Sequence, residues 1–207
     1  MLFDFHKIEN ELNKRLRYPY IWGTKQNNLL DKSTNFIYDI FEFDILVDKL
    51  KNESQETFNY ALNRWYNFWS AWAVEKIFCS HQKVKPAPEK DRFTDFFIDN
   101  INFDHKTTVF PNAYNQNIQF AYKNPVDLIN WLYKNQSQQQ RCHYKNRLFL
   151  VLFSSDLQHW KLKANISFLS QKINHYLDNF SIEKLQKIQL EKKTTTLSDI
   201  VWIYKKI

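Results

Sequence analysis

The sequence predicts an α/β fold in which a small mixed central sheet is flanked by helices, with extra helices at the N-terminus. Three observations predict it. Apolar residues recur at three- and four-residue steps over several long segments, the spacing of an amphipathic helix. Two strand-like segments meet at Asp99-Asn100, and RLFLVLF at 147–153 is an apolar run typical of a strand covered on both faces. The 207-residue chain is expected to be a single domain, with an N-terminal helical part over 1–54 and a core over 55–207.

The sequence of the N-terminal half predicts three helices, over 4–16, 34–51 and 55–79. The third is the most aromatic element of the chain. One stripe of its side chains follows four- and three-residue steps: Ala61, Trp65, Phe68, Trp72, Glu75 and Cys79. A carboxylate on an otherwise apolar face is costly unless it is paired or binds a metal. Glu75 is therefore a candidate site residue, although by itself this feature is explained more simply by a glutamate at the stripe edge that reaches solvent.

The C-terminal half predicts the sheet and the helices that cover it. After a basic, proline-containing loop at 81–93, the segments 94–98 and 101–110 are typical of strands. A helix is expected from Asn124-Pro125 to about Gln139, because Asn suits the N-cap and Pro the first helical position. The other expected elements are the strand at 147–153, a helix at about 162–178, a shorter helix behind Ser181 and a last strand at 199–204.

The pairing of the two strands around Asp99-Asn100 follows if these residues form a two-residue hairpin turn. Both residue types tolerate the left-handed conformation that such a turn needs. Paired positions then sum to 199, so Asp95 lies opposite Asp104, and Lys106 stands two residues along the same face. The opposite face is apolar and suits a core: Phe96, Ile98, Ile101, Phe103 and Val109.

Two opposed carboxylates destabilise a sheet unless something neutralises them. A hard divalent cation would do so, since Mg²⁺ is usually held by one or two carboxylates together with substrate phosphate oxygens. Lys106 lies about 7 Å along the strand from Asp104, so its side chain would reach a phosphate or an attacking water. Taken alone, the three residues are better explained as the acidic exposed face of a surface hairpin, because Asp and Lys are common surface residues.

The order of these features resembles the PD-(D/E)XK, or restriction-endonuclease-like, nuclease superfamily over roughly residues 58–153. In that superfamily a Glu on the first core helix, an Asp early in a strand and a (D/E)-x-K in the partner strand converge on one or two Mg²⁺ ions. The matching residues are Glu75, Asp95 and Asp104-His105-Lys106. Thr94 stands where the name-giving Pro precedes the Asp, which is a common variation. The first strand of the usual three-stranded meander has only Lys83-Val84-Lys85 as a candidate.

The resemblance implies a restriction-endonuclease-like core and Mg²⁺- or Mn²⁺-dependent phosphodiester hydrolysis. Asp95 and Asp104 would hold one or two ions, Glu75 would complete or extend the shell, and the backbone carbonyl of His105 would ligate as well. Lys106 would orient or help deprotonate the attacking water and stabilise the charge of the phosphorane. By alternation the His105 side chain points toward the core face, so it is expected to pack and not to act as a general base.

Basic residues at several places are candidates for contact with a nucleic-acid backbone, although each cluster is more often a solvated face. The formal net charge of +7 is compatible with a polyanionic partner, and an AT-rich coding bias would produce it too. DNA is expected more than RNA, and a homodimer would suit double-strand cutting. The candidate contact residues are Lys83, Lys85, Arg92, Arg141, Lys161 and Lys163.

Composition excludes several classes of protein. The chain has a single glycine, Gly23, so a dinucleotide-binding GxGxxG turn, a P-loop and a Gly-rich kinase loop cannot be built. No apolar run approaches the roughly 18 residues that cross a bilayer. Two cysteines do not make a disulfide framework, which favours a reducing, cytoplasmic setting. The set Cys79, His81, Cys142 and His143 matches none of the usual structural-zinc spacings.

Three functions follow as hypotheses. The first is a Mg²⁺-dependent nuclease that uses the Asp95, Asp104 and Lys106 constellation. The second is a catalytically inactive nucleic-acid-binding or assembly protein on the same fold. The third is an unrelated α/β domain, and it predicts that Asp95 and Asp104 are not side-by-side neighbours.

Overall fold

The computed structural model describes residues 4–22, 28–91, 93–135, 145–191 and 194–206. Contacts divide the chain into two compact units. The first unit comprises Met1–Val74 and Lys161–Leu169, and the second comprises Glu75–Trp160 and Ser170–Ile207. The long helix α4 (Gln55–Cys79) contributes to both, since its last five residues, Glu75 to Cys79, belong to the second unit.

Helices build the first unit. Its elements are α1 (Phe5–Arg15), α2 (Asn28–Ser33), the 3-10 helix η1 (Asn35–Tyr38), α3 (Phe43–Lys49), most of α4, part of the 3-10 helix η2 (His159–Ala164) and the start of α7 (Ile166–Asp178). The helices expected at 4–16 and 55–79 are confirmed as α1 and α4. Helix α1 begins behind Asp4, whose carboxylate accepts hydrogen bonds from the backbone N–H groups of His6 and Lys7.

The single helix expected over 34–51 is wrong, because the structure has η1 and α3 separated by an irregular segment. Contacts with α1 and α4 account for the break. The carbonyl of Ile40 accepts a hydrogen bond from the indole Nε1 of Trp65 at 2.7 Å, and the N–H of Phe43 donates to the Glu11 carboxylate at 2.7 Å. These backbone groups are therefore used by other helices and not by a continuous helical ladder.

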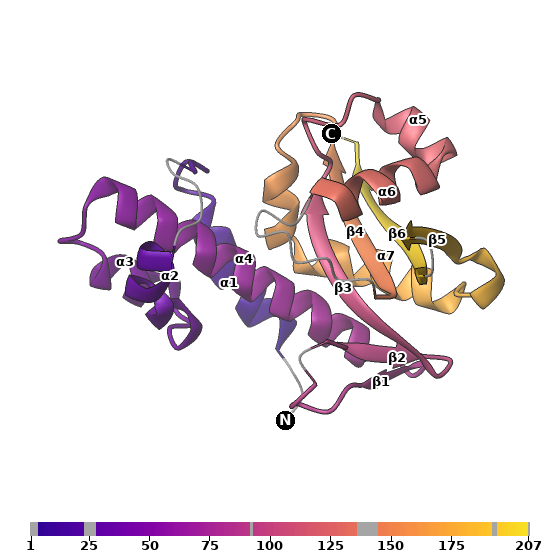
Figure 1. Ribbon diagram of the computed structural model, residues 1–207. Helices are drawn as coiled ribbons and strands as arrows, with labels where there is room; N and C mark the ends of the chain where they lie inside the picture. The colour runs from indigo at the N-terminus through magenta and orange to yellow at the C-terminus, as the bar shows by residue number, and fades with distance from the viewer. Residues whose placement is uncertain (1–3, 23–27, 92, 136–144, 192–193, 207) are drawn as a thin grey trace. The chain divides into compact units, whose positions relative to one another are not determined.

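The second unit holds a six-stranded mixed sheet in the order β1-β2-β3-β4-β6-β5 (Figure 1). The first three strands form an antiparallel meander, β4 is parallel to both β3 and β6, and β5 is antiparallel to β6. The α/β class and the mixed central sheet are thus confirmed. The strands are β1 (Val84–Pro86), β2 (Phe96–Ile98), β3 (Ile101–Val109), β4 (Arg147–Ser154), β5 (Gln186–Glu191) and β6 (Thr194–Lys205).

Helices cover both faces of this sheet. The helix α6 (Pro125–Asn135) packs with Phe149, Val151 and Ile200 on one face (Figure 1). On the other face, α7 reaches β6, where the hydroxyl of Tyr176 donates to Asp199 at 3.0 Å. Because both faces are covered, β4 is apolar along almost its whole length, as the run at 147–153 indicated.

The remaining elements are short. The helix α5 (Ile118–Lys123) precedes α6, whose expected extension over 136–139 lies outside the described residues. The shorter helix expected behind Ser181 is a single 3-10 turn, η3 (Ile182–Lys184). The strand β5 was not expected from the sequence, and β6 begins before the expected 199.

The hairpin turn at Asp99-Asn100 is confirmed. Both residues have positive φ, 48° and 63°, and the pairs Ile98–Ile101 and Phe96–Phe103 follow the register that sums to 199. The expected apolar face is also present, since the side chains of Phe96, Ile98 and Phe103 are fully buried.

The positive φ of Asn100 predicts how this turn responds to substitution. Asn100→Val should lower the free energy of unfolding by about 1–2 kcal/mol, because a β-branched residue is disfavoured in the left-handed region. Asn100→Gly should keep or raise it. Urea unfolding of the two variants beside the wild type measures the difference. Equal stability of the valine and glycine variants would contradict the turn geometry.

Candidate active site in the second unit

The Asp95 carboxylate is bound by His105. One carboxylate oxygen, Oδ2, accepts a hydrogen bond from the backbone N–H of His105 at 2.7 Å and lies 2.7 Å from its ring nitrogen Nδ1. Two groups of one residue therefore hold a single oxygen of Asp95. For the ring nitrogen to donate, it must carry the proton, as it does in the imidazolium ion or in the Nδ1–H tautomer.

The pairing of β3 explains why Asp95 lies there. Residues 101–103 of β3 pair with β2, and residues 104–109 pair with β4. The N–H of Asp104 donates to the Asn146 carbonyl on the β4 side, so the N–H of the next residue, His105, points toward the β2 side. The ladder with β2 ends at Phe103, and the Asp95 side chain supplies the acceptor that His105 needs.

The His105 imidazole is buried among aromatic rings. Its centroid lies 6.1 Å from that of Phe78 on α4 and 6.1 Å from that of Phe96 on β2, and the latter ring is stacked on it. Its side chain is 7% exposed. The expectation that this side chain points toward the core face is confirmed, and its hydrogen bond to Asp95 is an addition that alternation alone did not indicate.

Hydrogen bonding and charge shift both pKa values of this pair. Burial would lower the pKa of His105, but the hydrogen bond and charge of Asp95, with the charges of Asp104 and Glu75, outweigh burial and raise it. Burial would raise the pKa of Asp95, and the hydrogen bonds and charge of His105 outweigh it and lower the pKa. Three carboxylates are therefore close enough to act on one imidazole.

Asp104 has a different partner from Asp95. Its carboxylate is hydrogen-bonded to the guanidinium Nε of Arg147, the residue that pairs with it on β4. Since successive side chains of a strand point to opposite faces, Asp104 lies on the α6 face and the His105 side chain on the α7 face. The guanidinium also lies 5.8 Å from the ring centroids of both Tyr133 and Phe149.

The two aspartates thus do not form the expected opposed pair, which is the outcome that the third hypothesis, an unrelated α/β domain, predicted. The ladder of β2 and β3 ends at Phe96–Phe103, and the N–H of Asp95 donates to the Phe103 carbonyl at 2.9 Å. Asp95 is therefore not a continuation of the paired strand, and its carboxylate is turned toward His105. The register from the hairpin turn was extended one residue too far.

Glu75 and Cys79 lie one turn apart at the C-terminal end of α4. The Glu75 side chain is 32% exposed, and its carboxylate lies 3.5 Å from the ammonium of Lys76. Burial, reinforced by the charge of Glu75, raises the pKa of the Cys79 thiol to about 11. Cys79 is therefore protonated at neutral pH and is not a thiolate nucleophile.

Lys106 follows His105 on β3 and is exposed. By alternation its side chain lies on the same face as Asp104. The expected spacing of the Asp104-x-Lys106 pair along one face of the strand is therefore present.

The residues expected to contact nucleic acid differ in their exposure and in their hydrogen-bond partners. Lys85 and Lys161 are exposed, whereas Arg92 and Arg141 lie outside the described residues. The ammonium of Lys83 donates to the carbonyls of Leu177 and Asp178 at the end of α7, where a cation is favoured by the helix dipole.

Lys163 does not fit a surface role. It is buried in the first unit, where its ammonium donates to Asn67 Oδ1 at 2.6 Å, and burial lowers its pKa to about 8. The expected contact of this side chain with a nucleic-acid backbone is wrong, because the ammonium is buried and has Asn67 as its partner.

The donor chemistry of the candidate site fits a hard divalent cation. Glu75, Asp95 and Asp104 offer carboxylate oxygens, the ligands that Mg²⁺ prefers. Within the described ranges, however, no three His, Cys, Asp or Glu side chains converge closely enough to form a metal-binding group. Of the Cys79, His81, Cys142 and His143 set, which was not expected to bind zinc, Cys142 and His143 lie outside those ranges.

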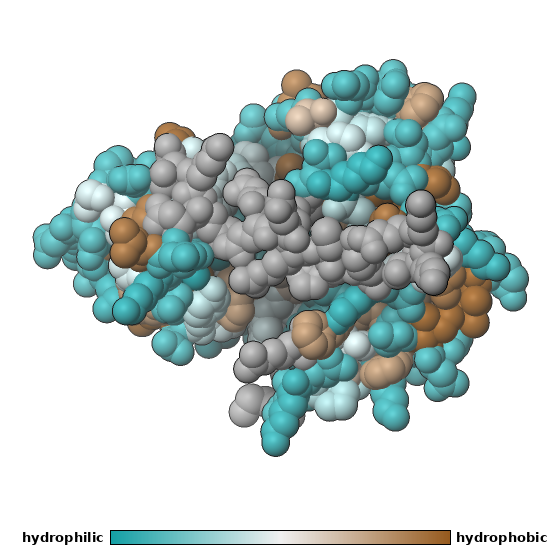
Figure 2. All heavy atoms as spheres, viewed as in Figure 1, coloured by the Kyte–Doolittle hydropathy of each residue, from teal (hydrophilic) through white to brown (hydrophobic). Residues whose placement is uncertain are grey.

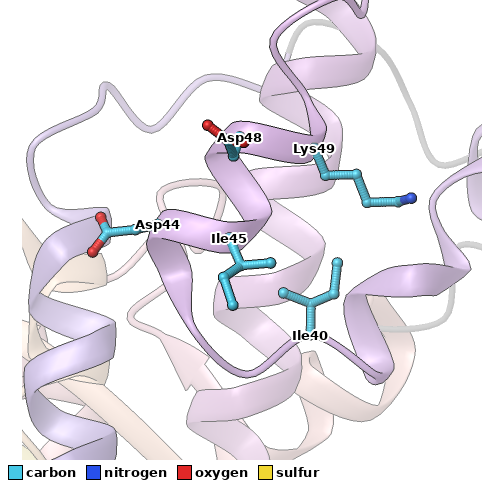
Figure 3. Close-up of a pocket in the computed structure, with 5 residues that line it drawn as sticks. All are labelled: Ile40, Asp44, Ile45, Asp48 and Lys49. Carbon is cyan, nitrogen blue, oxygen red and sulfur yellow. The ribbon is translucent and has the colours of Figure 1, made fainter.

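A separate surface pocket of about 610 Å³ occurs in the first unit, lined by Ile40, Asp44, Ile45, Asp48 and Lys49 (Figure 3). Its two aspartates are paired, Asp44 with Lys14 at 2.7 Å and Asp48 with Lys51. None of the residues of the candidate site lines it. In the view of Figure 2, the coloured surface is mostly hydrophilic, with hydrophobic residues in small groups.

Comparison with known proteins assigns no family. No family model matches the chain, and neither a curated protein nor a solved structure matches it. Among the residues that the structure describes, no helix has both the length and the apolar character needed to span a bilayer.

The pair formed by Asp95 and His105 predicts a distinct titration. In metal-free solution, the His105 pKa should lie above the ordinary value of about 6.5, and Asp95→Asn should lower it. Because the His105 pKa is raised, the stability that the pair contributes is lost as the pH rises from about 6.5 through the folded-state pKa of His105. Because the Asp95 pKa is lowered, the same contribution is lost in acid, as the pH falls through the folded-state pKa of Asp95.

NMR of the histidine ring nitrogens measures the first effect, and urea unfolding of both proteins at about pH 5.5 and about pH 9 measures the second. The stability difference between the wild type and Asp95→Asn should be larger at the lower pH. A His105 pKa at or below the ordinary value would contradict the pairing.

Proposed function

We propose that this protein is a metal-dependent nuclease that hydrolyses phosphodiester bonds, with DNA as its substrate, at a site of the PD-(D/E)XK type. The succession of elements supports the proposal. The helix α4 is followed by the antiparallel meander β1-β2-β3, then by helices α5 and α6, and then by β4 parallel to β3. The meander includes a strand at Val84–Pro86, where the sequence offered only a weak candidate.

The observation that carries the proposal is a contact between two parts of the superfamily pattern, because the Asp95 carboxylate is hydrogen-bonded to His105 of the Asp104-His105-Lys106 tripeptide. Asp95 binds His105 directly, and the charges of Asp104 and Glu75 also act on its imidazole. Glu75, Asp95 and Asp104 are the three acidic residues that the superfamily pattern selects, on α4, directly before β2, and on β3.

In this proposal Asp95 and Asp104 hold Mg²⁺ or Mn²⁺, with Glu75 and the backbone carbonyl of His105 extending the shell. The ion, when bound, supplies an activated water and neutralises the charge that develops on the phosphate. Lys106, exposed on the Asp104 face, contacts the phosphate or orients the water. The exposed Lys85 and Lys161 are kept as candidate contacts with the nucleic-acid backbone.

Substitution of the acid and the lysine of β3 tests the activity. Asp104→Asn and Lys106→Met should each lower the Mn²⁺-dependent cleavage rate of plasmid and single-stranded DNA by about 10²-fold or more. Matched controls are Asp48→Asn on α3 and Lys187→Met on the edge strand β5, both exposed, which should cleave as the wild type does. Undiminished cleavage by both β3 variants would overturn the site, and no cleavage by the wild type would overturn the activity.

A second function is a catalytically inactive nucleic-acid-binding or assembly protein on the same fold. The ion pair of Asp104 with Arg147 favours it, because a guanidinium that permanently neutralises Asp104 removes the need for a metal. In the nuclease, by contrast, Arg147 and the metal ion compete for this carboxylate.

Arg147→Met separates the two functions. In the nuclease it should raise the affinity for Mn²⁺, measured by calorimetry, because Asp104 loses its competing cation. In the inactive protein the same change should leave Mn²⁺ binding absent. It should also lower the free energy of unfolding by about 1–3 kcal/mol, since a half-buried carboxylate loses its partner. Salt-sensitive DNA binding without Mn²⁺ binding would establish the inactive protein.

A further inference from the structure

We infer that the C-terminal half of β6 is a docking site for a second copy of this chain, which pairs there through its own β6 in the antiparallel direction. The strand β5 pairs with residues 194–198 of β6, whereas β4 pairs with residues 198–205 (Figure 1). Within the described residues, no strand continues β5 alongside 199–205. This stretch is the free edge of β6, and a role for it in dimer formation is independent of the proposed nuclease function.

Hydrogen bonds show which backbone groups of β6 face the free edge. The carbonyl of Lys205 accepts a hydrogen bond from the N–H of Ser155 on the β4 side, at 3.2 Å. Because the backbone groups of successive residues point to alternate sides of a strand, the N–H and C=O groups of Trp202 and Tyr204 point away from β4. In the part of the chain that the structure describes, no hydrogen bond reaches these groups from that side. They can therefore pair with an added strand.

The two outer strands of the sheet are protected against such pairing, and the free edge of β6 is not. The strand β1 is three residues long and ends in Pro86. The strand β5 has an irregularity between Gln189 and Glu191 and an exposed lysine, Lys187. Short length, proline, lysine and bulges all discourage edge-to-edge association. The segment 200–204 reads Ile-Val-Trp-Ile-Tyr, without charge, proline or bulge.

The free edge is complementary to itself when two copies run antiparallel about a twofold axis at Trp202. Trp202 then exchanges both backbone hydrogen bonds with Trp202 of the second copy, and Ile200 lies opposite Tyr204. Lys205 lies beside Asp199 of the second copy, so opposite charges meet at both ends of the paired segment. Because the two copies use the same edge, the arrangement closes as a dimer.

Two aromatic side chains follow the free edge on the α6 face of β6. Tyr204 is 46% exposed, although its ring stacks on that of Phe153 at 5.6 Å. Trp202 is partly buried, and its ring lies 5.5 Å from that of Tyr122. In the paired arrangement, Trp202 meets its copy and Tyr204 meets the β-branched Ile200, and cross-strand pairs of these two kinds stabilise a sheet.

The Asp199 carboxylate is partly buried and would gain from a further cation. It accepts hydrogen bonds from the hydroxyl of Tyr176 at 3.0 Å and from the N–H of Ile200 at 2.8 Å. Burial nevertheless raises the pKa of Asp199, because these bonds and the charge of Lys184 do not outweigh the loss of solvation. The ammonium of Lys205 from the second copy would stabilise the charged carboxylate, which favours the paired register.

Proline at the free edge tests the pairing. Since the N–H of Trp202 points away from β4, Trp202→Pro keeps the hydrogen bonds to β4 and removes one intermolecular donor from each copy. Sedimentation velocity over a range of concentrations should show a monomer–dimer equilibrium for the wild type. The dissociation constant should be about 10–100-fold higher for Trp202→Pro, because two hydrogen bonds are lost.

The matched control is Lys187→Pro, which removes an N–H from the outer side of β5 and should dimerise as the wild type does. Urea unfolding reports whether each variant folds. If Trp202→Pro does not fold, Tyr204→Pro replaces it, because it removes the other outward donor of the free edge.

A disulfide locates the contact. In a chain whose two native cysteines are replaced by alanine, Trp202→Cys should form a covalent dimer on oxidation. The Cα atoms of a hydrogen-bonded antiparallel pair lie about 5.5 Å apart, within the range of a disulfide. Lys187→Cys in the same background should remain a monomer on a denaturing gel.

A wild type that is monomeric at every concentration overturns the docking site and leaves the proposed nuclease in place. A dimer whose dissociation constant is the same in Trp202→Pro, or is raised equally by Lys187→Pro, uses another surface and also overturns it. Cross-linking through Lys187→Cys and not through Trp202→Cys has the same meaning.

Discussion

The strand β3 changes its hydrogen-bonding partner between Phe103 and Asp104, and the candidate site depends on that change. Up to Phe103 the strand pairs with β2, and from Asp104 onward it pairs with β4. Backbone groups that lose one strand partner require another acceptor or donor. The Asp95 carboxylate meets that requirement for the N–H of His105, and at the same level of the sheet the Asp104 side chain meets Arg147 of β4.

Charge balance is the second constraint on this part of the sheet. Three carboxylates act on His105, and each has a cationic or polar partner within the protein: Asp95 has His105, Asp104 has Arg147 and Glu75 has Lys76. In the proposed nuclease, a metal ion would have to replace Arg147 as the partner of Asp104. The two aspartates therefore differ in their partners within the protein, a difference that their sequence pattern does not reveal.

Local rules predicted much of this arrangement. The positive-φ residues Asp99 and Asn100 set the hairpin register, and the three- and four-residue spacing predicted α4 from end to end. Long-range contacts account for the misses. The hydrogen bond from Trp65 to the Ile40 carbonyl lies where the helix expected over 34–51 is interrupted, and burial beside Asn67 removes Lys163 from the surface. The opposition of Asp95 and Asp104 failed because the ladder of β2 ends one pair earlier, a feature that no residue spacing encodes.

The tripeptide Asp104-His105-Lys106 places side chains on both faces of β3. Alternation places Asp104 and Lys106 on the α6 face and the His105 side chain on the opposite face, against Phe78 of α4. The ladder between β2 and β3 ends at Phe103, so the next N–H on that edge of β3, that of His105, is left for the Asp95 carboxylate. A residue that begins a strand without being paired in it is thus fixed by the side chain of its neighbour across the sheet. The ring that holds the Asp95 carboxylate is thus packed against Phe78 of α4 and Phe96 of β2.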